Sequence, residues 1–168
     1  MSTPDFTPHA DELLGHNTRF ADDFPNAGVP GRPERNLAVV TCMDCRLDPR
    51  EMLGLAKGDA HIMRNAGGVL TDDMVRSLVM SQRALGTREV MIVHHTNCGM
   101  EGVDNEGFVD HLEQETGVRP DWGPEGFDDV VADVRAAIQR LRDSPFLLHK
   151  DHIRGFVYDV DTGRLNEV

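Results

Sequence analysis

The sequence predicts an α/β domain with a central, mainly parallel β-sheet flanked by helices. Two short and unbroken apolar runs, 37–40 and 89–93, are typical of strands that are buried on both faces. Helical patterns lie between these runs and after them, and such alternation of strands and helices is typical of a parallel sheet. The length of 168 residues and the hydrophobic content of 39% suit one globular domain with a single core.

The segment before the first strand is polar and is expected to form an N-terminal helical arm. Residues 8–24 show a weak helical pattern that ends at Pro25, and residues 26–31 follow as a loop. The apolar side chains of this helix are Leu13, Leu14, Phe20 and Phe24. Because these are too few to form a core, we expect the arm, 1–35, to lie on the domain, 36–168, or on a partner subunit.

Two further strands are predicted from other patterns along the chain. Residues 61–63 form a third and weaker apolar run between the two strong ones. Residues 152–160 read as a strand that runs into a turn at 161–163.

Two helices are predicted within the domain. The first has Thr71 as its N-cap and continues to Gly86, with a repeated apolar face of Met74, Val75, Leu78, Val79 and Leu85. The second spans 127–141 and stops before Pro145, with an apolar face of Val130, Val131, Val134, Ile138 and Leu141. The glycine- and proline-containing stretch 117–126 is expected to be a loop.

All three cysteines lie in two clusters that directly follow the strong apolar runs. The first cluster spans 42–46 and the second spans 94–99, which also contains two histidines. Functional groups of parallel sheets collect beyond the carboxyl ends of the strands. Thiolate and imidazole are preferred ligands of Zn²⁺, so the sequence predicts a zinc site at this edge of the sheet.

The donors available for zinc are Cys42, His95 and Cys98, with Asp44 or Cys45 as the candidate fourth ligand. Strand side chains alternate between faces, so one of His94 and His95 points at the site, and we expect His94 to be a surface or hydrogen-bonded residue and not a ligand. The long separation of Cys42 and His95 requires two neighbouring strand ends that are joined by a crossover helix. The remaining histidines lack neighbouring ligands and are expected to have no metal role: His9, His16, His61, His111, His149 and His152.

Two alternatives give Cys45 a role. If Cys45 completes the tetrahedron, the zinc is structural and the protein is not an enzyme. If Cys42 and Cys45 form a redox pair, the second cluster remains unexplained. Asp44 and Arg46 favour an open, reactive zinc, because an arginine beside a metal can hold a carboxylate as a hydrogen-bond acceptor.

The segment that follows the third apolar run is a candidate substrate pocket. Asn65, Ala66 and Gly67 belong to the stretch 64–68, whose two glycines allow backbone amides to approach a ligand or to line a narrow pocket. An ordinary turn is the alternative interpretation.

Composition excludes several other classes of function. The net charge of -12 would repel nucleic acid and anionic membranes. No stretch has the length of a membrane span, and the first twenty residues do not resemble a secretory signal. Clustered cysteines suit a reducing compartment, so we expect a cytoplasmic protein.

Three motifs together resemble those of the β-class carbonic anhydrases: Cys42-x-Asp44-x-Arg46, Arg64-Asn65-Ala66-Gly67 and His95-x-x-Cys98-Gly99. The resemblance is strongest over 36–103. It implies an α/β sheet of four parallel strands with an antiparallel last strand. It also implies a homodimer or higher homo-oligomer in which the N-terminal arm clasps a partner subunit and the active sites lie at the interface.

The resemblance further implies a zinc-dependent reversible hydration of carbon dioxide to bicarbonate. Zinc would be bound by Cys42, His95 and Cys98, while Asp44 either pairs with Arg46 or becomes a fourth ligand. Related members hydrolyse carbonyl sulfide or carbon disulfide, which makes this the alternative activity. Cys45 departs from the family, because many members have serine at this position.

Overall fold

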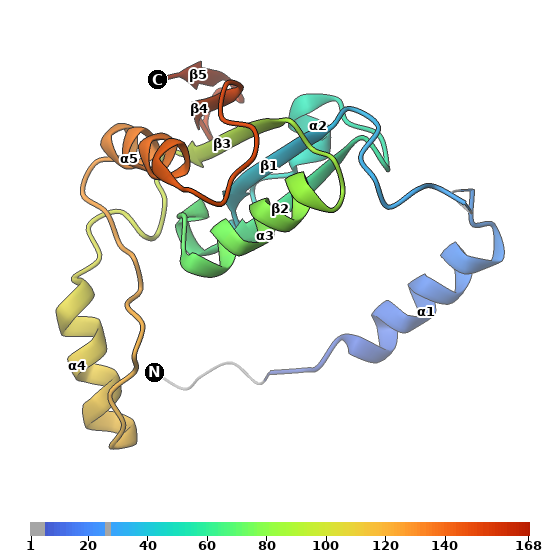
Figure 1. Cartoon of the computed structure of the whole chain (residues 1–168). Coiled ribbons are helices and arrows are strands. Elements are labelled where there is room, and N and C mark those ends of the chain that lie inside the picture. The colour runs from blue at the N-terminus through green and yellow to red at the C-terminus, as the bar shows by residue number, and fades with distance from the viewer. Residues whose placement is uncertain (1–5, 26–27) are drawn as a thin grey trace.

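The computed structural model describes residues 6–25 and 28–168 of the chain (Figure 1). Residues 1–5 of the predicted arm and 26–27 of the predicted loop lie outside the described residues. In the described part, five strands form one sheet in the order β2-β1-β3-β4-β5. Their bounds are β1 Leu37–Cys42, β2 Ala60–Asn65, β3 Glu89–His95, β4 Ile153–Tyr158 and β5 Leu165–Glu167.

The predicted fold class is confirmed by the directions of these strands. β1 pairs in parallel with both β2 and β3, and β3 pairs in parallel with β4. The short last strand, β5, is antiparallel to β4. Four of the strand ends therefore meet at one edge of the sheet, which is where functional groups of such folds gather.

Helices cover both faces of the sheet (Figure 1). On one face, α3 (Asp72–Arg83) and α5 (Val130–Asp143) pack on side chains from β1 and β3 that include Val40 and Ile92. On the other face, residues of α2 (Pro49–Leu53) pack near Val39 and Val93. The alternation of strand side chains assigns these residues to opposite faces, and each fully buried aliphatic side chain contributes about 1.5–3 kcal/mol.

Capping residues set the bounds of the two predicted domain helices. Thr71 caps α3 as predicted, with its side chain accepting a hydrogen bond from the amide of Met74. α5 begins at Val130 and not at 127, because Asp129 caps it and Phe127 pairs with the backbone of residues 100–102. The prediction for 127–129 was therefore wrong.

Three elements were not predicted. They are α2, the single helical turn η1 (Ala66–Gly68) and α4 (Asn105–Thr116). α4 buries only Val109 among its described residues, so its sequence lacks the apolar stripe that identified α3 and α5. In addition, β2 extends to Asn65, so Arg64 and Asn65 belong to the third strand and do not follow it.

The N-terminal helix, α1 (Ala10–Asp22), projects away from the sheet, as does α4 (Figure 1). None of the described residues of α1 is buried. Its contact with the domain includes the ammonium of Lys57, which lies 4.4 Å from the ring centroid of Phe20. No described helix has the length and apolar composition that a membrane crossing requires.

Candidate metal centre

The two central strands place the predicted donors side by side. Cys42 is the last residue of β1, His95 is the last residue of β3, and Cys98 lies three residues beyond β3. Because β1 and β3 are parallel neighbours, their carboxyl ends adjoin. The donor atoms of the three residues lie within 4.8 Å of one another, and all three residues are buried. This group could hold a metal ion.

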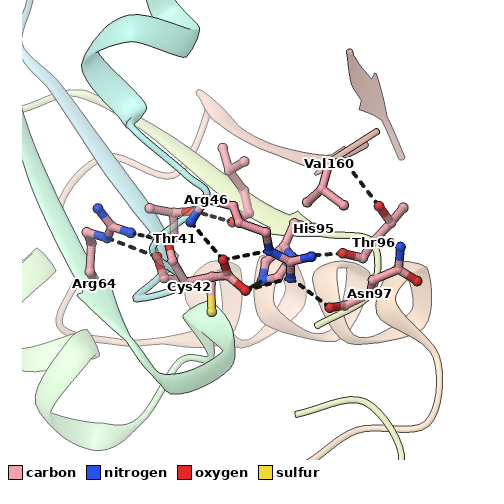
Figure 2. Close-up of polar contacts among 10 residues, drawn as sticks. Thr41, Cys42, Arg46, Arg64, His95, Thr96, Asn97 and Val160 are labelled. Atoms are coloured by element: carbon pink, nitrogen blue, oxygen red, sulfur yellow. Dashed lines mark hydrogen bonds and ion pairs between the residues drawn. The ribbon is translucent and has the colours of Figure 1, made fainter. Parts of the chain in front are cut away.

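The connection between these strands is longer than predicted. The chain passes from β1 through α2, β2 and α3 before it reaches β3, so a single crossover helix does not join the two ligand strands. A buried hydrogen bond joins them directly near the site. The hydroxyl of Thr41 donates to the carbonyl oxygen of Val93 at 2.7 Å (Figure 2).

The two buried thiols differ in acidity. Burial disfavours the thiolate of Cys42, but the neighbouring His95 imidazole and the backbone of Asp44 and Gly67 outweigh burial and lower the pKa of Cys42 to about 7. Burial raises the pKa of Cys98 to about 11. Cys42 is therefore the more readily ionised of the two sulfur donors, and metal binding would have to displace the proton of Cys98.

His95 presents one nitrogen to the site. Its Nδ1 lies 2.9 Å from the carbonyl oxygen of Thr96, which can only accept, so the proton is on Nδ1. Its buried Nε2 has no hydrogen-bond partner in the described structure. A buried nitrogen without a partner is costly, and a metal ion held with the two cysteines would satisfy it.

Asp44 is paired with Arg46 and is not part of the group of three donors. The Arg46 guanidinium donates to both carboxylate oxygens, at 2.9 Å from Nε and 2.7 Å from Nη2, and the Arg46 amide adds a third bond at 2.9 Å. Arg46 also donates to the carbonyl oxygen of Asn97 at 2.9 Å, which ties the first ligand loop to the second (Figure 2). The Arg46 side chain holds the pKa of Asp44 far below its ordinary value. Oδ2 of this carboxylate lies 3.8 Å from Nε2 of His95.

Arg64 has a role that sequence reasoning missed. Its guanidinium donates to the carbonyl oxygens of Cys42 at 2.9 Å and Asp44 at 2.7 Å (Figure 2). Arg64 comes from β2, the neighbour of β1, so it holds the ligand loop from the opposite side to Arg46. The motif containing Arg64 was recognised, but a backbone partner cannot be read from a sequence.

Cys45 does not join the donor group. The group found in the described residues consists of Cys42, His95 and Cys98, whereas Cys45 is exposed. The described structure therefore does not bring Cys45 together with the other three residues as the four-ligand alternative requires. Cys42 and Cys45 are both free thiols here.

His94 is hydrogen-bonded elsewhere, as predicted. The side chain is fully buried, and its Nε2 lies 3.1 Å from the carbonyl oxygen of Gly68. Its ring stacks on Phe127, with 5.7 Å between the ring centroids. His94 therefore faces the α5 layer, on the side of the sheet that also holds Ile92.

An apolar cavity of about 510 Å³ lies next to the second cluster, because Gly99, the residue after Cys98, lines it. Asn65 and Ala66 line it, together with Met100, Phe108 and Trp122, which sequence reasoning did not select. Gly67 is buried behind this lining. Gly99 and Met100, which directly follow Cys98 along the chain, form part of the cavity wall.

Comparisons with known proteins agree with this geometry. A protein-family model described as carbonic anhydrase matches residues 37–165. β-Carbonic anhydrase 1 of Mycobacterium tuberculosis is 48% identical over 158 residues, which cover 94% of this chain and 96% of the relative. A carbon disulfide hydrolase of an Acidianus species is 30% identical over 185 residues, covering 93% of this chain and 89% of the relative. The crystal structure of a carbonic anhydrase from Streptococcus mutans matches with a TM-score of 0.88 and 42% identity, covering 98% of this chain and 99% of that chain.

Proposed function

The chain belongs to the β-carbonic anhydrase family, and from this premise we propose that it binds one zinc ion and catalyses the reversible hydration of carbon dioxide to bicarbonate. The observation that carries the proposal is the buried group of Cys42, His95 and Cys98, with Asp44 paired to Arg46 beside it. Three protein donors leave one position of a tetrahedron open, as a catalytic zinc requires.

The donor set fits zinc. Two sulfur atoms and one imidazole nitrogen are typical zinc ligands, and Nε2 of His95 is a buried atom that lacks a hydrogen-bond partner in the described structure. Zinc bound there would lower the pKa of a coordinated water and so supply a nucleophile near neutral pH. The carbonyl of Thr96 fixes the His95 tautomer, which is a usual function of the residue that contacts a metal-binding histidine.

We assign Asp44 and Arg46 to catalysis as a pair. Held by the Arg46 guanidinium, the Asp44 carboxylate is ionised and can only accept hydrogen bonds. Its Oδ2 lies 3.8 Å from Nε2 of His95, beside the donor group. From this position Asp44 would accept a hydrogen bond from the attacking nucleophile and orient that nucleophile toward the substrate. If the contact with Arg46 were lost, Asp44 would be free to become a fourth ligand and close the site.

The substrate is proposed to enter through the apolar cavity. Asn65, the register partner of Cys42, and Ala66 line this cavity, and Gly67 joins them to the turn behind Cys42. Carbon dioxide is small, linear and without net charge, so an apolar wall suits it. The bicarbonate product is charged and would leave toward water.

Carbon disulfide or carbonyl sulfide hydrolysis is the second candidate, favoured by the relatives that carry the name carbon disulfide hydrolase. These molecules are linear analogues of carbon dioxide and could use the same donor group. A pocket distinguishes apolar molecules that differ slightly in size by only about 1–3 kcal/mol, so direct comparison is required.

We also propose that the protein acts as a homodimer or higher homo-oligomer in the cytoplasm, with the arm, 1–35, on a partner subunit. Leu13, Leu14, Phe20 and Phe24 of the arm are exposed in the isolated chain. Burial of these side chains by a second copy would stabilise the assembly. Light scattering across a dilution series would measure the oligomeric state, and a monomer at all concentrations would contradict the proposal.

The experiment that tests the activity is stopped-flow carbon dioxide hydration by protein of known zinc content, at mildly alkaline pH. Rapid turnover at one zinc per chain supports the proposal. Full zinc content without carbon dioxide turnover contradicts it, and the same protein is then assayed with carbonyl sulfide and carbon disulfide. If all three gases fail, the site is structural despite its open geometry.

A further inference from the structure

His94 stands next to a proposed ligand but belongs to a different set of contacts. The carbonyl oxygen of Gly68 can only accept a hydrogen bond, so Nε2 of His94, 3.1 Å away, carries the proton. On the other side of the ring, Nδ1 lies 3.4 Å from Oδ2 of Asp133, which is in the first turn of α5. The buried ring therefore spans from the η1 turn to α5.

The η1 turn lies directly behind the proposed ligand Cys42. Gly67 and Gly68 have φ angles of 77° and 74°, in the left-handed region that favours glycine. A Cβ atom on Gly68 would lie 2.8 Å from the amide nitrogen of Cys42 and 3.2 Å from the ring of His94. Gly68 is therefore packed between the strand that carries Cys42 and the imidazole.

The turn also supplies a polar contact to the ligand sulfur. The backbone of Gly67 is one of the groups that favour the ionised form of Cys42 and so lower the pKa of its thiol. An amide that donates to a metal-bound thiolate withdraws electron density from sulfur and so tunes the metal. The orientation of the Gly67 amide depends on the turn, and the carbonyl of the next residue, Gly68, is held by His94.

We propose that His94 is a positioning residue for the metal centre. Its Nε2–H holds the η1 turn against Cys42, while Asp133 fixes the orientation of the imidazole. The proposal rests on the proposed function, because His94 would support the metal centre that Cys42 helps to form. Phe127 supports the same orientation from the face of the ring. On the α5 side, Oδ2 of Asp133 lies 3.4 Å from Nδ1, which has no hydrogen-bond partner in the described structure.

Substitutions of His94 that place a nitrogen near Nε2, near Nδ1 or at neither position distinguish this hydrogen-bonding role from a contribution of the ring to packing alone. His94→Gln places an amide nitrogen near the position of Nε2, where it can still donate to Gly68. His94→Asn places its amide near the position of Nδ1 and leaves the Gly68 carbonyl without this donor. His94→Phe keeps an aromatic ring that stacks on Phe127 but has neither nitrogen.

The readout is Co²⁺ binding, followed by the thiolate-to-cobalt absorption band and by competition with a chelator. We expect His94→Gln to remain close to wild type. His94→Phe and His94→Asn should weaken cobalt binding by about 10–100-fold, the range found when partners of metal ligands are removed, and should shift the absorption band. Wild-type affinity and an unshifted band in His94→Phe would overturn the proposal.

His61 provides a matched control far from the donor group. Its Nε2 also lies near a carbonyl oxygen, that of Gly31 at 3.2 Å, and its Nδ1 contacts the hydroxyl of Ser81 at 2.7 Å. His61→Phe thus removes a comparable pair of contacts without touching the η1 turn. It should leave cobalt affinity and the absorption band unchanged, whereas an equal loss in both variants would show a general effect of stability and contradict the proposal.

A second pair of variants and a direct measurement on the wild-type protein test the proposal even if the His94 variants do not fold. Asp133→Asn supplies a permanent N–H donor for Nδ1 and should preserve the absorption band, whereas Asp133→Leu should shift it. Long-range ¹H–¹⁵N NMR of the metal-free wild-type protein reports the tautomer of His94, and a ring protonated on Nδ1 alone would overturn the proposal. A wild-type protein that binds neither cobalt nor zinc would refute the proposed function instead, while the tautomer would still decide whether His94 holds the turn.

Discussion

Substitution of Thr41 by valine tests whether β1 and β3 are held together beside the donor group. Thr41 is fully buried, and its hydroxyl donates to the carbonyl oxygen of Val93 at 2.7 Å. Valine has nearly the same shape but no hydroxyl, so Thr41→Val removes the bond without opening a large cavity. A buried acceptor that loses its donor costs about 1–3 kcal/mol of unfolding free energy.

Urea unfolding of metal-free protein measures this cost. With a denaturant dependence of about 2–3 kcal/mol per molar urea, the midpoint should fall by about 0.3–1.5 M. Protein concentration must be the same for each variant, because dissociation of an oligomer also contributes to the midpoint. Zinc affinity should fall as well, since the bond lies one residue before Cys42 and two before His95.

Thr87→Val is the matched control. Thr87 is also fully buried, but its partner is the hydroxyl of Ser81, which keeps a second contact to His61 at 2.7 Å. This variant should lose some stability and no zinc affinity. The reasoning is refuted if Thr41→Val unfolds at the same urea concentration as the wild type, or if both variants lose zinc affinity equally.

Three further predictions concern individual side chains. Asp44→Asn should keep zinc, measured by metal analysis, but lower the rate of carbon dioxide hydration by about 10–100-fold, and full activity would remove Asp44 from the mechanism. Cys45→Ser should keep both zinc and activity, whereas loss of zinc would support the structural alternative. The backbone amide of Ala56 and the Arg35 guanidinium lower the pKa of Asp59, so this carboxylate stabilises the fold above its unfolded pKa of about 4 and ceases to do so as the pH falls through its lower folded value. The difference in urea midpoint between wild type and Asp59→Asn should therefore shrink from pH 6 to pH 3, and a difference that is constant over this range would contradict the assignment.

The sequence predicted the central elements because their patterns report burial directly. The unbroken runs at 37–40 and 89–93 became β1 and β3, and Thr71 became a helix cap. α4 escaped prediction because a helix that buries little of its surface has no apolar stripe to reveal it. The start of α5 was misplaced because Phe127 continues the apolar pattern of the helix while its backbone pairs elsewhere.

The donor group was predictable because the fold class converts distant positions into neighbours. Cys42, His95 and Cys98 lie at or just beyond the ends of strands that had to meet if the sheet was parallel. Contacts made by backbone atoms were not predictable in this way. The bonds from Arg64 to the ligand loop and from His94 to Gly68 depend on the direction of carbonyl groups, which the residue types do not specify.

The location of the donors on two paired strands has a consequence for the order of folding. Neither cluster alone supplies all three ligands, so a complete site exists only after β1 and β3 have associated across the intervening segment. Such non-local pairing is slow compared with helix formation. A metal ion would then bind late, to chains whose sheet has already closed, and would stabilise them by mass action. The rate at which refolding chains acquire cobalt colour should consequently report the association of these two strands.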